Sequence, residues 1–159
     1  MEHWDGSSWS VVSAPGVPSS DVLLDGVTAT GDGQVWAVGE ADSPAGGGQP
    51  LIEHYAPGAG WRIASLPAIP DKGNWANLYG IATNGTTVYA VGTYVDPATD
   101  NNNALLLSSV KGGPWTIVGA PQPGSGSNLP GGITQVGGQF WLAGVFDTGG
   151  SRLPLIEHH

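Results

Sequence analysis

The chain repeats one set of short apolar phrases about every 50 residues, and this repetition constrains its fold more than any other feature. Four phrases recur in the same order and keep nearly the same spacing from copy to copy. They begin at Trp9, Trp61 and Trp115, at Gly26, Gly80 and Gly132, at Trp36, Tyr89 and Trp141, and at Leu51, Leu105 and Leu155. The sequence therefore predicts three copies of one structural unit.

Each phrase has the composition of a β-strand. The phrases are rich in Val, Ile, Trp and Tyr and are bounded by turn residues, and the 27 glycines and 13 prolines would interrupt most helices. Residues 35–38 are apolar at successive positions, which is typical of a strand covered on both faces. We therefore predict an all-β fold of β-propeller blades, each with an inner, a second, a third and an outer strand.

The repeats are expected over residues of about 2–52, 53–107 and 108–156, and residues 157–159 are interpreted as the end of a third strand and the start of a purification tag. An Asp5-Gly6 turn is expected to join a short arm to an outer strand over residues 9–14. The C-terminal phrase is a third strand that no outer strand follows. The tryptophans of the repeated phrases are expected to pack in the core or between blades.

Three blades are fewer than the four to eight or so that close a propeller ring. A three-blade arc would leave apolar faces and strand edges open. Two chains give six blades, so we expect a homodimer. At each junction between the two chains, here called a seam, the partner's strand at Trp9 is expected to complete the incomplete blade. Three chains would give nine blades, just beyond the usual range. The other interpretation is that the chain belongs to a longer repeat protein whose ring closes on itself.

Three phrases of the first copy carry a family resemblance. Residues 2–10, 35–39 and 51–54 resemble the tandem repeats of bacterial, mostly secreted, β-propeller proteins of kelch-like blade length. The third copy departs from this pattern, since it does not open with a Glu-His pair. The resemblance implies a propeller scaffold in an extracellular or cell-surface location. It implies no specific activity, because these families share no assigned one.

The charge balance excludes some partners. Four Lys and Arg face 13 Asp and Glu, giving a net charge of −9, so a nucleic acid or an anionic lipid is not expected to bind. No apolar run is long enough for a membrane span. The absence of cysteine excludes a disulfide scaffold.

An aspartate follows each second strand at nearly the same offset, at Asp42, Asp96 and Asp147. Loops of this kind gather at one end of a propeller, where such carboxylates could bind a cation or sugar hydroxyls. The competing interpretation is that each aspartate only begins a turn by accepting backbone N–H groups. In the loop of residues 96–103, Asp96 and Asp100 are candidate Ca²⁺ ligands, although the EF-hand pattern is absent. Otherwise no cofactor is expected.

Two aromatic residues lie outside the repeated phrases. Trp75 stands in an insertion without a Trp counterpart in the other copies, and Tyr94 precedes Asp96. Either side chain could contact a sugar ring or a protein partner, or it could cover the core. The chain lacks a Cys nucleophile, a Gly-X-Ser-X-Gly motif and a phosphate-binding loop.

Two functions follow from these observations. The first is a non-enzymatic scaffold or binding module that assembles with itself. The alternative is a carbohydrate-binding, lectin-like propeller, which the two non-equivalent arginines, Arg62 and Arg152, disfavour as a site repeated in every blade. An enzyme is not expected.

Overall fold

The computed structural model describes residues 1–18, 20–42, 46–120 and 122–158, and every regular element in these ranges is a β-strand. The prediction of an all-β protein is confirmed. The described part of the chain contains no helix that could cross a membrane. Pro121 of the third Trp phrase and His159 of the possible tag lie outside these ranges.

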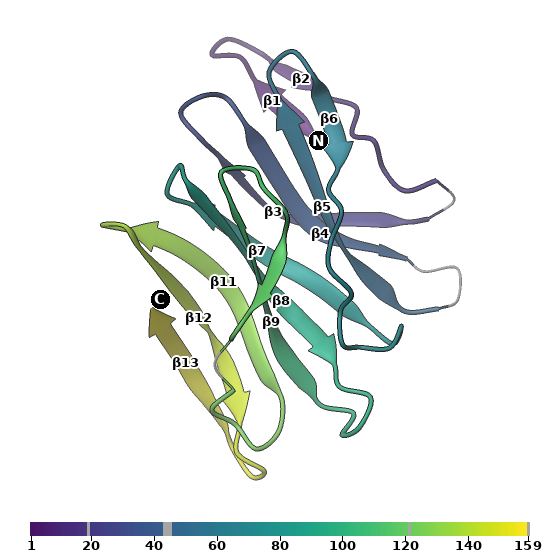
Figure 1. Ribbon diagram of the computed structural model, residues 1–159, viewed down its shortest axis with the longest axis vertical. Coiled ribbons are helices and arrows are strands. Elements are labelled where there is room, and N and C mark those ends of the chain that lie inside the picture. The colour runs from purple at the N-terminus through teal and green to yellow at the C-terminus, as the bar shows by residue number, and fades with distance from the viewer. Residues whose placement is uncertain (19, 43–45, 121, 159) are drawn as a thin grey trace.

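The described strands form four antiparallel sheets, in each of which neighbouring strands follow chain order (Figure 1). A hairpin comes first, and three larger sheets follow. The hairpin contains β1 (Glu2–Trp4) and β2 (Trp9–Val11); the first sheet β3 (Val22–Ala29), β4 (Val35–Asp42), β5 (Gly48–Ala56) and β6 (Gly60–Ile63); the second sheet β7 (Ala76–Thr83), β8 (Thr87–Val95), β9 (Asn102–Val110) and β10 (Thr116–Val118); and the third sheet β11 (Asn128–Val136), β12 (Gln139–Asp147) and β13 (Arg152–His158).

The three larger sheets share a β-bulge at one place. It lies in the opening strand of each sheet, where the register shifts between Leu24/Gly26, Leu78/Gly80 and Pro130/Gly132. The facing position of the next strand is a glycine each time. A Cβ on Gly39, Gly92 or Gly144 would lie 1.9, 1.9 or 2.2 Å from a carbonyl oxygen of the bulged strand. The glycine that ends the repeated phrase beginning at Trp36, Tyr89 and Trp141 is therefore required by the bulge opposite it.

The opening strand β7 lies between the opening strands β3 and β11 and contacts both (Figure 1). A Cβ on Gly26 would be 3.2 Å from the Cα of Gly80, and a Cβ on Gly80 would be 3.3 Å from the Cα of Gly132. Such spacing is tighter than ordinary van der Waals contact. The glycine that begins the second repeated phrase therefore lets three backbones approach closely.

The core lies between the sheets. One cluster joins Trp36, Val38 and Ile52 of the first sheet to residues of the second sheet such as Ile81 and Leu107. A smaller cluster joins the second sheet to the third. Each interface buries one face of two neighbouring sheets, so the second sheet is covered on both faces.

The β1–β2 hairpin has the expected turn. The carboxylate of Asp5 accepts hydrogen bonds from the backbone N–H groups of Ser7 and Ser8, at 2.7 and 2.8 Å. These bonds hold the pKa of Asp5 well below its usual range. Strand β2 ends at Val11, earlier than the predicted strand over residues 9–14.

The tryptophans of the repeated phrases differ in burial. Trp36 and Trp115 are buried between the first two sheets, whereas Trp9 and Trp141 are exposed. The prediction that all of them pack in the core or between blades is therefore wrong for Trp9 and Trp141 in the single chain. Both lie where no further sheet of the described ranges covers them.

Candidate functional site

The three aspartates lie at strand ends in separate sheets. Asp42 is the last residue of β4 and Asp147 the last of β12, while Asp96 follows β8. Asp147 Oδ1 pairs with Arg152 Nε at 3.0 Å, and this bond lowers the pKa of Asp147. No hydrogen bond or ion pair between described residues joins the three aspartates to one another.

The candidate calcium loop uses its carboxylate within the turn. Asp96 Oδ1 accepts the N–H of Ala98 at 2.8 Å, and Asp96 Oδ2 accepts Nδ2 of Asn103 at 3.3 Å. Asp100 has a left-handed backbone with a φ of 60°. Nowhere in the described ranges do three His, Asp or Glu side chains gather in a way that could hold a metal ion.

Trp75 and Tyr94 lie at the same end of the second sheet. The carbonyl of Trp75 accepts the N–H of Val95 at 2.8 Å, and Tyr94 pairs with Ala76. Tyr94 packs against the core, and its hydroxyl accepts Nδ2 of Asn103 at 3.3 Å. The ring of Trp75 remains 40% exposed. Of these two aromatic residues, Trp75 is therefore the better placed to meet a ligand.

One position of the third strand differs sharply in exposure among the three sheets. Ile52 faces Val38, Leu106 faces Val91 and Ile156 faces Ala143 in the register of their sheets, so the three side chains are equivalent. Ile52 and Leu106 are 0% and 4% exposed, but Ile156 is 71% exposed. Ile156 and the exposed Trp141 thus mark an open apolar face on the third sheet.

The first sheet has a second open face on its opposite side. Val27 pairs with Ala37 as Ile81 pairs with Ala90, so Val27 and Ile81 occupy equivalent positions. Val27 is 68% exposed and Ile81 is 7% exposed. Ile81 packs in the same cluster as Ile52. The open face of the third sheet therefore carries residues equivalent to one side of the interface between the first and second sheets. The open face of the first sheet carries residues equivalent to the other side.

The open face of the third sheet continues into an open strand edge. No strand of the described ranges pairs with the outer edge of β13, whereas β6 and β10 pair with the corresponding edges of β5 and β9. Such an edge is a template for another strand.

Strand β1 has the register of a third strand. Glu2 pairs with Val11 as Glu53 pairs with Ile63. The next backbone bond also corresponds, from Val12 N to Met1 O at 2.9 Å and from Ala64 N to Ile52 O at 2.8 Å. β1 therefore occupies, on β2, the place that the end of β5 occupies on β6.

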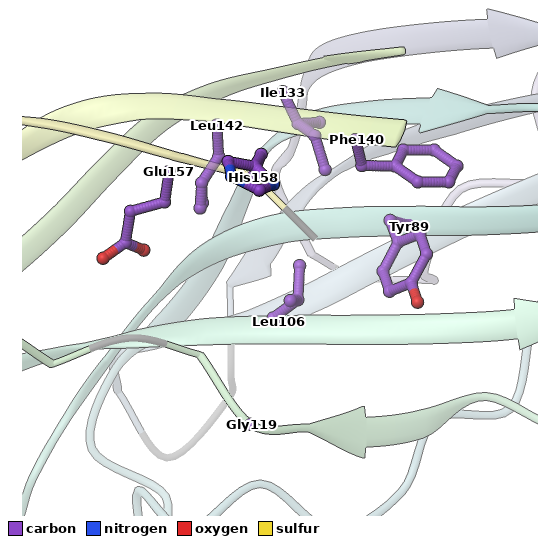
Figure 2. Close-up of a pocket in the computed structure, with 8 residues that line it drawn as sticks. All are labelled: Tyr89, Leu106, Gly119, Ile133, Phe140, Leu142, Glu157 and His158. Atoms are coloured by element: carbon purple, nitrogen blue, oxygen red, sulfur yellow. The ribbon is translucent and has the colours of Figure 1, made fainter. Parts of the chain in front are cut away.

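A small cavity lies between the second and third sheets, and Figure 2 shows its lining. Its volume is about 60 Å³, and its walls include Leu106, Phe140 and Leu142. The Tyr89 and Phe140 rings pack at 4.5 Å between centroids. Burial raises the pKa of Glu157, whose Oε2 has no hydrogen-bond partner among the described residues. The cavity is too small for anything beyond a few water molecules.

A larger groove lies between the first two sheets and contains residues that the sequence did not predict to form a site. Arg62, His54 and Ser65 line it together with Trp115, in a space of about 420 Å³. These side chains come from different strands and loops, and Arg62 has no counterpart in the other repeats. Sequence spacing alone therefore carried no signal for this group.

No protein-family model matches the chain, and no curated protein matches its sequence. Function must therefore be inferred from the open faces, the strand edge and the groove.

Proposed function

We propose that the chain is a non-enzymatic β-propeller scaffold that assembles with a second copy of itself. In this proposal each larger sheet is a blade, and two chains form one six-bladed ring. The open face of the third sheet in one chain covers the open face of the first sheet in the other.

The exposure of Ile156 carries the proposal. Its equivalents Ile52 and Leu106 are buried because a following sheet covers them, whereas Ile156 is 71% exposed. The opposite face shows the complementary difference, since Val27 is exposed where Ile81 is buried. The first sheet of a second copy would therefore pack on the third sheet through contacts equivalent to those between the first and second sheets of one chain.

Strand pairing at the seam follows the same equivalence. We expect β2 of the partner to pair with the outer edge of β13, as β6 pairs with β5. Because β1 holds the same place on β2, it must leave that place when the partner's β13 arrives. Closure of the ring would remove the open β13 edge of each chain from solvent.

The oligomeric mass tests this function. Multi-angle light scattering of the purified 159-residue chain is expected to give twice the chain mass of 16.1 kDa. Three times that mass would indicate a nine-bladed assembly. A stable, folded species of the single-chain mass would contradict self-assembly and favour further blades of a longer chain as the natural cover.

A carbohydrate-binding propeller is the second candidate, and the surroundings of Trp75 favour it. The exposed ring lies beside Gly48, since a Cβ on Gly48 would be 3.1 Å from Trp75 Cε2 and 2.6 Å from Glu40 Oε2. An exposed indole is suited to pack against the apolar face of a sugar ring, whereas the neighbouring Glu40 Oε2 is buried. A glycan array on which no sugar binds would rule this candidate out.

A further inference from the structure

The groove between the first and second sheets is lined by a cationic side chain and by apolar residues. Arg62 of β6 and Ser65 lie on one side, and Pro114 and Trp115 lie on the other. The groove has a volume of about 420 Å³, within the range of small-molecule sites. It lies within one chain, so its chemistry does not depend on ring closure.

Arg62 is held in a defined position by a chain of hydrogen bonds. Its Nη2 donates to Nδ1 of His54 at 3.0 Å, so Nδ1 must carry a lone pair and Nε2 must carry the proton. His54 Nε2 then donates to Gln34 Oε1 at 2.9 Å. Burial and the nearby Arg62 charge both lower the pKa of His54, which favours the neutral ring. The ring is also stacked on Trp36 at 4.6 Å between centroids.

Arg62 lacks a carboxylate partner among the described residues, although acidic residues greatly outnumber basic ones. The ion pair found in the described part of the chain joins Arg152 to Asp147, in the third sheet. Asp32 is the carboxylate at the far end of the hydrogen-bond chain, where it accepts bonds from Gln34 and Thr30. Of the five N–H donors of a guanidinium, Arg62 uses one on His54, so several remain for a ligand.

The rest of the groove suits the body of an organic acid. The Ser65 hydroxyl makes no hydrogen bond to any described residue, and it lines the same space as Arg62. Ile63 and Ala64 continue the apolar wall that Pro114 and Trp115 begin on the facing sheet. A group bound there would thus find one ionic contact, one hydroxyl and apolar walls.

We propose that this groove binds a carboxylate attached to an aromatic or aliphatic group. The carboxylate pairs with the free donors of Arg62 and accepts the Ser65 hydroxyl, while the apolar group packs between Ile63 and Trp115. A planar guanidinium matches the two oxygens of a carboxylate better than an ammonium does. The acid can be a free organic acid or the C-terminus of a peptide, which share this chemistry.

The other repeats lack a cationic residue at the position of Arg62, so we expect one such site in each chain. In the second sheet Ser108 pairs with Thr116, at the positions that His54 and Arg62 occupy in the first sheet. Neither residue is cationic. Arg62→Thr therefore places in the first sheet the residue that the second sheet already accommodates there, and the fold is expected to tolerate it.

Titration followed by NMR, with ¹⁵N-labelled protein, tests the proposal. Phenylacetate and an acetylated dipeptide ending in leucine are the probes, and phenylacetamide and the amidated dipeptide are their neutral controls. We expect at least one acid to shift the Arg62 and Trp115 signals with an affinity near the millimolar range. A stronger response to phenylacetate than to the dipeptide would identify free acids as the better fit, and the reverse would identify peptide termini.

Variants complete the test. Arg62→Thr is expected to weaken binding about tenfold or more, and Arg62→Lys to weaken it less. Arg152→Thr removes the same charge from a different sheet and is expected to leave binding unchanged. Equal binding of the acids and their amides, unaltered binding by Arg62→Thr, or no response to either acid would overturn the proposal. Each of these results leaves the oligomeric mass, and thus the proposed assembly, unaffected.

Discussion

The interface between the first and second sheets and the open face of the third sheet present equivalent residues in opposite environments. At the interface, Trp36, Val38 and Ile52 are buried against the following sheet. On the third sheet, Trp141 and Ile156 have the same places in the register, but they face solvent. The two sheets share the same bulge in the opening strand and the same glycine opposite it.

The difference shows that burial in this chain is decided by the neighbouring sheet and not by the strand. A sheet with apolar side chains on both faces needs a neighbour on each side, as in other repeat architectures. Only the second sheet has both neighbours within the described chain. We therefore expect the same substitution to have different effects at equivalent positions.

The largest effect is expected for Ile52→Ala. This change removes a fully buried side chain from the interface and should lower the free energy of unfolding by about 2–5 kcal/mol. Ile156→Ala is the matched control at the equivalent position, where we expect a loss of less than about 0.5 kcal/mol in dilute protein. Urea unfolding of both variants measures the difference. Equal losses would show that the third sheet is already covered in the single chain.

The next effect concerns association. Ile156→Asp places a charge where the proposed partner would bury an isoleucine, so we expect the dimer to dissociate about 100-fold more readily. The fold of the single chain should survive, because Ile156 is exposed there. Sedimentation equilibrium over a range of concentrations gives the dissociation constant, and circular dichroism verifies the fold. An unchanged constant would move the contact away from this face.

Much of the fold could be predicted from the sequence because the repeat marks its strands. Recurrent apolar phrases indicated strands in an order that the pairing of β3–β6 and β7–β10 follows. The roles of the glycines were not predictable, because Gly39 is required by a bulge on another strand and Gly26 by the backbone of another sheet. Both requirements depend on distances that a single phrase does not contain.

Less of the candidate sites could be predicted. Trp75 stood out because it falls outside the repeat, and its ring is exposed. The contact of Arg62 with His54 joins two strands, and it depends on the register of β5 and β6. The repeat gave no indication of a site at Arg62, because the corresponding residues, Ser10 and Thr116, are uncharged.

A smaller change is expected from His3→Pro in β1. Proline lacks the backbone N–H and disfavours the strand interior, so β1 should leave β2 more easily. Because β1 and the partner's β13 would compete for the same edge of β2, we expect association to tighten by up to about tenfold. Asp21→Ala, outside the hairpin, is a control. Weaker association would instead indicate that β1 and β2 enter the seam as one hairpin.

The smallest effect tests the comparison at a charged position. Glu53, Leu107 and Glu157 are equivalent, and Glu53 Oε1 accepts the N–H of Gly16 at 3.1 Å. Oε2 lacks a partner among the described residues in both Glu53 and Glu157, and burial raises the pKa of the Glu157 carboxyl. Glu157→Leu introduces the residue that the second sheet has there. It should stabilise the protein by less than about 1 kcal/mol, because Glu157 remains partly exposed.

The sign of the pH dependence distinguishes this explanation from a general gain in apolar contact. A carboxyl whose pKa is higher in the folded state carries no penalty below its unfolded value of about 4.3, where both states are protonated. Stability is lost as the pH rises from that value through the raised folded value. Thermal unfolding at about pH 3.5 and pH 7 should therefore show a larger gain for Glu157→Leu at pH 7. An equal gain in stability at both pH values would assign the effect to packing alone. Glu53→Leu is the control: it loses the bond to Gly16 and should therefore stabilise the protein less than Glu157→Leu does.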